Sequence, residues 1–134
     1  MKLYSAICWI FAVAFAAVLG MLAVVPEMLS DLMNWSGGLV GLSGDIAVAP
    51  ASLEHVLALS LMATITYLAQ AAARAPENRD LYWAIQTAKV ISTGGFAFMA
   101  FTAGSIWFLP TATDGLVIVG LAFARFQVDT ELAE

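Results

Sequence analysis

Lys89 is the residue whose position most clearly invites chemistry, because it is an ionisable side chain inside a long apolar stretch. A charged group within a membrane-spanning helix is a candidate functional residue by default. Gln86, Lys89 and Thr93 share one face at helical spacing. Tyr67 and Gln70, near the end of the preceding apolar stretch, lie at a comparable depth. These five residues are therefore predicted to form a polar pocket that binds a lipid headgroup, a quinone or an anionic solute.

A second interpretation of Lys89 requires no ligand. A lysine near a helix end can extend its amine along the apolar stem to reach the headgroup region. The acidic partners within reach there are Asp80 and the C-terminal residues Asp129, Glu131 and Glu134. On this hypothesis Lys89 anchors its helix at the membrane interface.

His55 is the single histidine, and it stands beside Glu54 at the start of the second apolar stretch. An imidazole next to carboxylates can bind a divalent cation or respond to external pH. The spacing of the two residues matches no metal-ligand motif such as H-E-x-x-H. The expectation is a solvated helix end, with His55 and Glu54 as weak metal candidates.

Several function classes lack their residues in this sequence. The single cysteine, Cys8, excludes zinc ribbons, iron–sulfur clusters and c-type haem attachment. Glycine-rich nucleotide motifs and the G-x-S-x-G motif do not occur. With a formal net charge of -5 the chain offers no basic surface for nucleic acid. An enzyme is therefore a weaker expectation than a non-catalytic protein.

The composition predicts an all-α integral membrane protein made of one domain. The 134 residues are 62% hydrophobic and 11% charged, whereas soluble domains are usually about 45–50% apolar and about 25% charged. Four spans are predicted, over residues 3–26, 53–74, 81–109 and 112–128, in a compact bundle. Thr111 and Asp114 have the spacing of a capping box, which sets the start of the fourth span. Residues 27–52 form a long outer loop, which begins with a short amphipathic helix.

The basic residues predict the orientation of these spans. All five lie toward one side of the predicted membrane. Lys2 precedes the first span, and Arg74 and Arg79 lie between the second and third spans. Lys89 lies in the part of the third span near that side, and Arg125 lies at the end of the fourth span. The positive-inside rule then places both termini in the cytoplasm. Compact spans joined by short loops suit a bacterial cytoplasmic membrane, and an organelle membrane equally.

Small residues predict where helices approach one another. Ala12, Ala16 and Gly20 form a stripe at every fourth position of the first span, which suits packing within the chain or self-association. The favoured function is an accessory subunit, an assembly factor or a binder of a lipid or quinone within a larger membrane complex. The alternative is a small oligomeric transporter or channel, with Lys89 and a helix break at Gly94 and Gly95 on the path.

Overall fold

The computed structural model describes residues 1–47 and 49–132, and within them the chain is helical, as the sequence predicts. The elements follow in the order α1 (Lys2–Val24), α2 (Pro26–Leu39), α3 (Leu53–Arg74), α4 (Arg79–Thr102), the 3-10 turn η1 (Ser105–Trp107) and α5 (Phe108–Glu131). The last long helix begins at Phe108, so the capping box predicted at Thr111 is wrong. Thr111 instead lies inside α5, where its hydroxyl donates to the carbonyl oxygen of Trp107.

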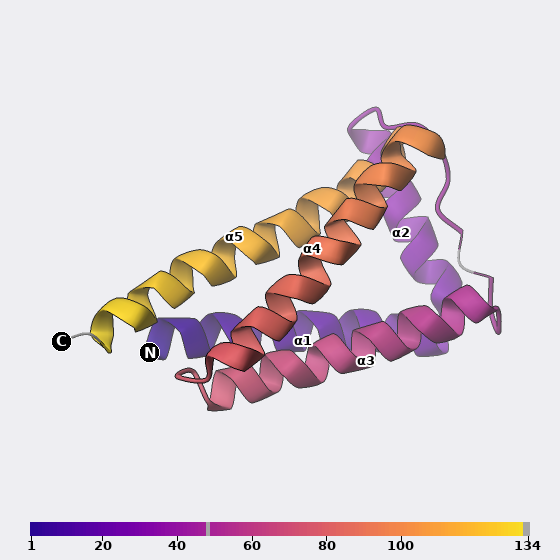
Figure 1. Cartoon of the computed structure of the whole chain (residues 1–134). Helices are drawn as coiled ribbons and strands as arrows, with labels where there is room; N and C mark the ends of the chain where they lie inside the picture. The colour runs from indigo at the N-terminus through magenta and orange to yellow at the C-terminus, as the bar shows by residue number, and fades with distance from the viewer. Residues whose placement is uncertain (48, 133–134) are drawn as a thin grey trace.

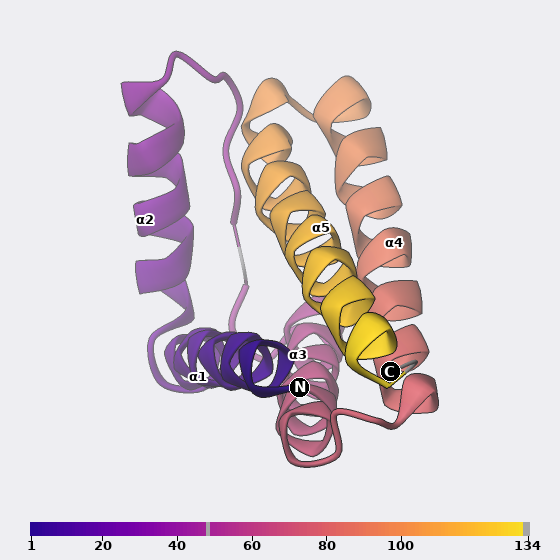
Figure 2. The same ribbon diagram turned by 90° about the vertical axis from the view of Figure 1, so that its left-hand side faces the viewer.

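The long helices pack as two pairs. α1 lies alongside α3, and α4 lies alongside α5 (Figure 1). The two pairs meet at the end where α1 begins and α5 ends, and they diverge toward the opposite end (Figures 1 and 2). There α2 leaves the end of α1 and reaches the turn η1 between α4 and α5. The short connection between α3 and α4 lies at the end where α1 begins and α5 ends (Figure 1).

The core forms where the pairs meet. Tyr4, Cys8, Leu121, Ala124 and Val128 are at most 1% exposed there. Alanines of α3 complete the same cluster: Ala69, Ala72 and Ala73. Small side chains let helix backbones approach closely, which provides packing energy where lipid supplies no hydrophobic driving force.

The small-residue stripe of α1 divides between core and surface. Ala12 is buried in the core, whereas Ala16 and Gly20 are exposed. A methyl group added at Gly20 would meet nothing within 4 Å. Only the first part of the stripe therefore packs within this chain.

Three helices are long and apolar enough to cross a membrane: Lys2–Val24, Leu53–Arg74 and the stretch Ser105–Glu131 that contains α5. The prediction of an all-helical chain is confirmed for the described residues, and these three helices support the prediction of membrane-spanning segments. α4 does not meet the same criterion, although its 24 residues extend about 36 Å. It continues without interruption through Gly94 and Gly95, both of which are exposed.

The connection after α2 packs against the chain itself. The amide of Asn34 donates to the carbonyl oxygen of Ile46 at 3.0 Å and accepts from its N–H at 2.8 Å. The N–H of Ile106 donates to the carbonyl oxygen of Ser43 at 2.9 Å. Residues 26–35, predicted as a short helix, are helical within α2. The bond between Ile106 and Ser43 joins the connection after α2 to the turn between α4 and α5.

Gly104 is expected to be essential for the close contact between the connection after α2 and the turn between α4 and α5. Its φ of +139° is a conformation that side-chain-bearing residues rarely adopt, and an added Cβ would lie 2.9 Å from the carbonyl oxygen of Ser43. We expect Gly104→Ala to lower the free energy of unfolding by about 2–3 kcal/mol, measured by denaturant titration in detergent micelles. Gly94→Ala is the control, because its Cβ meets no atom within 4 Å and alanine favours a helix. Equal stabilities of Gly104→Ala and the parent would contradict the tight junction.

Candidate functional site

A buried ion pair joins α4 to α5. The Nζ of Lys89 donates to Oδ1 of Asp114 at 2.7 Å, and both residues are less than a tenth exposed. The hydroxyl of Ser92 contacts the other carboxylate oxygen of Asp114. The ring of Phe15 on α1 lies under the ammonium group, with 4.5 Å between Nζ and the ring centroid. Three helices thus surround one pair of opposite charges.

Helical periodicity explains how α4 supplies this site. Tyr82, Gln86, Lys89 and Thr93 recur at intervals of four, three and four residues, so they follow one stripe of the helix. Nε2 of Gln86 donates to the carbonyl oxygen of Ile118 on α5 at 3.0 Å and lies 3.2 Å from the hydroxyl of Tyr82. The stripe therefore faces α5 along much of the helix.

Two side-chain oxygens on this stripe are buried without a partner in the described part of the chain. They are Oε1 of Gln86 and Oγ1 of Thr93. Buried polar atoms of this kind usually bond to an ordered water. They mark the α4–α5 contact as a polar interface within otherwise apolar helices.

The predicted five-residue pocket is gathered only in part. Gln86, Lys89 and Thr93 share one face of α4, and the side chains of Gln86 and Lys89 bond to α5. Tyr67, however, is 69% exposed on α3, and Gln70 is half-buried. None of the five residues lines the groove between the beginning of α1 and the end of α3, or the hollow beside Arg79 and Arg125.

The interfacial interpretation of Lys89 is wrong, because its amine bonds to Asp114 and not to Asp80 or the C-terminal acids. Sequence reasoning missed Asp114 because the capping-box spacing assigned it to a helix start. A signal was nevertheless present, since a charge inside a membrane segment requires a partner. Ser92 carried no comparable signal.

A second buried cation, Arg125, lies where the helices meet. Its guanidinium donates to the carbonyl oxygen of Pro76 at 2.6 Å and to Oδ1 of Asp129 at 3.0 Å. Its guanidinium carbon lies 5.8 Å from the ring centroid of Tyr4 and 5.9 Å from the ring centroid of Tyr82. Arg125 is 4% exposed, so it fastens α5 to the α3–α4 connection.

His55 connects the beginning of α3 to the end of α1. Its Nε2 lies 2.6 Å from the carbonyl oxygen of Leu22, and its Nδ1 accepts from the N–H of Ala51 at 3.1 Å. These two bonds imply a neutral ring with the proton on Nε2. Both nitrogens are engaged, and Glu54 beside it is exposed. Within residues 1–47 and 49–132, no three His, Cys, Asp or Glu residues are grouped to hold a metal ion.

Comparison of the chain with protein-family models, with curated proteins and with solved structures finds no match.

Proposed function

We propose that the chain is a four-span integral membrane protein in which α4 is the remaining span. α3 ends at the side of the molecule where α1 begins and α5 ends, whereas α5 begins at the opposite side (Figure 1). The chain between them must cover that distance, and α4 covers it alongside α5. The layout of the helices supports four crossings and termini on one side.

The ion pair supplies the energetic reason why α4 tolerates the membrane interior. An unpaired lysine near the middle of a span is costly, whereas a lysine paired with a carboxylate carries no net charge. Lys89 lies near the middle of α4, and Asp114 neutralises it at 2.7 Å. The mean hydropathy of α4 includes Lys89 as a charged residue. For this reason it falls below the mean hydropathy of the neighbouring helices.

The charges at the two ends support cytoplasmic termini. Lys2, Arg74, Arg79 and Arg125 all belong to the end where α1 begins and α5 ends. The described part of the opposite end has no lysine or arginine. Its acidic residues are Glu27, Asp31, Asp45 and Glu54. Basic residues favour the cytoplasmic side of a membrane. A bacterial cytoplasmic membrane is the proposed location.

Within that membrane the protein acts as a non-catalytic accessory subunit or assembly factor. One observation carries this proposal: the interior charges are engaged with each other and are closed to an external ligand. Lys89 and Asp114 are 7% and 8% exposed and satisfy one another. A quinone or lipid headgroup would have to break that pair, so the Lys89 site is better suited to holding helices together.

Native mass spectrometry after extraction in a mild detergent tests this role. We expect the 14.2 kDa chain to appear mainly within assemblies that contain other polypeptides. The Lys89→Met/Asp114→Leu double variant, which leaves the exposed surfaces of the helices unchanged, should retain these partners. An assembly made only of copies of this chain would contradict the accessory role.

A small oligomeric transporter remains the second candidate because one surface of α4 is bare. Gly94 and Gly95 are exposed, and a methyl group at either would meet nothing within 4 Å. Such a surface admits close approach of another helix, as do Ala16 and Gly20 on α1. Substrate flux in proteoliposomes that contain the purified chain and no other polypeptide would favour this candidate over the accessory subunit.

A further inference from the structure

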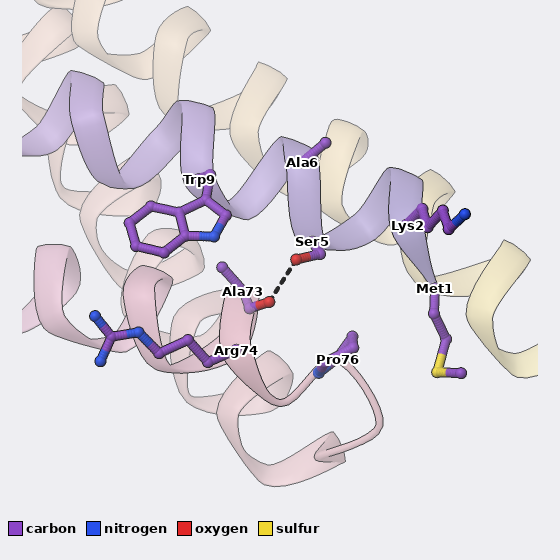
Figure 3. Close-up of a pocket in the computed structure, with 8 residues that line it drawn as sticks. All are labelled: Met1, Lys2, Ser5, Ala6, Trp9, Ala73, Arg74 and Pro76. Carbon is purple, nitrogen blue, oxygen red and sulfur yellow. Dashed lines mark hydrogen bonds between the residues drawn. The ribbon is translucent and has the colours of Figure 1, made fainter.

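A shallow groove of about 480 Å³ lies between the beginning of α1 and the end of α3. Its lining comprises Met1, Lys2, Ser5, Ala6, Trp9, Ala73, Arg74 and Pro76 (Figure 3). Lys2 and Arg74 stand on opposite sides of it, and the indole of Trp9 lies next to Arg74. The guanidinium carbon of Arg74 is 5.7 Å from the centroid of the Trp9 ring.

The two basic residues of this groove differ from the other basic residues of the described chain in having no carboxylate partner. Lys89, Arg79 and Arg125 each bond to a carboxylate. Lys2 and Arg74 form no ion pair with the described residues, and both are exposed. No Asp or Glu lines the groove, and Glu131, which lies beside it, is paired with the N-terminal ammonium of Met1. Two uncompensated positive charges therefore flank one hollow.

The polar atoms on the floor of the groove bond to each other. The hydroxyl of Ser5 donates to the carbonyl oxygen of Ala73 at 2.5 Å, which occupies an acceptor that would otherwise face the hollow (Figure 3). The first turn of α1 and the last turn of α3 both lie at the groove, so the partial positive charge of one helix end is offset by the partial negative charge of the other. The attraction for an anion therefore comes from Lys2 and Arg74, and basic side chains of this kind attract phosphate groups.

The surroundings indicate that the phosphate belongs to a lipid. Both helices that form the groove are long and apolar enough to cross a membrane, and the groove lies at the end of each. Ile10 and Val13, 64% and 66% exposed, continue along α1 from Trp9 toward the middle of the helix. Tryptophan concentrates at the level of lipid headgroups. A soluble anion would contact Lys2 and Arg74 but would make no contact with the exposed apolar residues Ile10 and Val13.

We propose that this groove binds the headgroup of an anionic phospholipid, with Lys2 and Arg74 attracting the phosphate and exposed residues of α1 contacting an acyl chain. The inference rests on the proposed placement of α1 and α3 in the membrane. It depends neither on the fourth span nor on the accessory role.

Native mass spectrometry with added lipid tests the site. We expect the detergent-extracted parent to retain phosphatidylglycerol at least tenfold more than phosphatidylcholine. Lys2→Gln/Arg74→Gln should reduce the retention of phosphatidylglycerol to the level of phosphatidylcholine. Arg79→Gln is the matched control, because it removes one charge at the same end from a residue already paired with Asp129. The control should retain phosphatidylglycerol like the parent.

Undiminished phosphatidylglycerol retention in the double variant would overturn the proposal, as would equal retention of both lipids by the parent. Inorganic phosphate that binds the parent as well as phosphatidylglycerol does would assign the groove to a soluble anion. Both substituted residues are exposed, and thermal unfolding would verify that the variants fold. Cysteine labelling of the helix ends, described below, reports the span count independently of lipid binding.

Discussion

Removal of either member of the Lys89–Asp114 pair is expected to be among the most damaging single changes in this chain. Lys89→Met leaves the carboxylate of Asp114 buried without its cation, and Asp114→Leu leaves the ammonium of Lys89 buried without its anion. Breaking a buried pair on one side typically costs about 3–5 kcal/mol. Denaturant unfolding in detergent micelles should show a loss of this size for each single variant.

The double variant Lys89→Met/Asp114→Leu separates the cost of an unpaired charge from the loss of the pair itself. Replacing both members by apolar side chains leaves no charge inside the protein, so most of the lost stability should return. Ser92→Ala, which removes one hydrogen-bonding hydroxyl from Asp114, should have a smaller effect than either single variant. Additive losses in the double variant would show that the two residues are not coupled.

The second large effect is expected at Arg125. Arg125→Met preserves the apolar stem and removes the guanidinium from the carbonyl oxygen of Pro76 and from Asp129. Hydrogen bonds to a charged group contribute about 1.5–3 kcal/mol each, and Pro76 and Asp129 are both partly exposed, so water can replace part of this loss. We expect a lower unfolding temperature and faster proteolysis in the α3–α4 connection, which Arg125 holds against α5.

Arg79→Gln provides the comparison, since Arg79 also bonds to Asp129 but its side chain is 67% exposed. Exposed ion pairs contribute little to stability. This variant should unfold at nearly the same temperature as the parent. A loss at Arg79 as large as that at Arg125 would mean that the shared carboxylate, and not the buried guanidinium, fastens the connection.

The local features of this fold follow well from the sequence, because lipid forces backbone hydrogen bonds into helices and makes apolar length informative. Ser52 caps α3 by accepting from the N–H of His55, and Arg74 ends the same helix as predicted. The divergence of the helix pairs and the close approach of Ser43 to Gly104 did not follow from the sequence. Both depend on contacts between segments far apart in the chain, which periodicity does not encode.

The candidate site was predictable in its α4 half only. Gln86, Lys89 and Thr93 could be placed on one face because helical spacing fixes relative direction. Asp114 could not, since its pairing depends on how α5 is aligned with α4. An error at the start of α5, which begins at Phe108 and not near position 112, turned an interior carboxylate into a capping residue.

The most direct test of the account is the side of the membrane on which each end of α4 lies. Cys8 is buried, and a Cys8→Ala background frees the chain for single cysteines. Glu77→Cys and Thr102→Cys place thiols at exposed positions beside the two ends of α4, and Glu131→Cys reports the end of α5. The account predicts that an impermeant maleimide labels Thr102→Cys in intact cells, and Glu77→Cys and Glu131→Cys only after permeabilisation. Labelling of Glu77→Cys and Thr102→Cys from the same side would contradict a membrane-crossing α4.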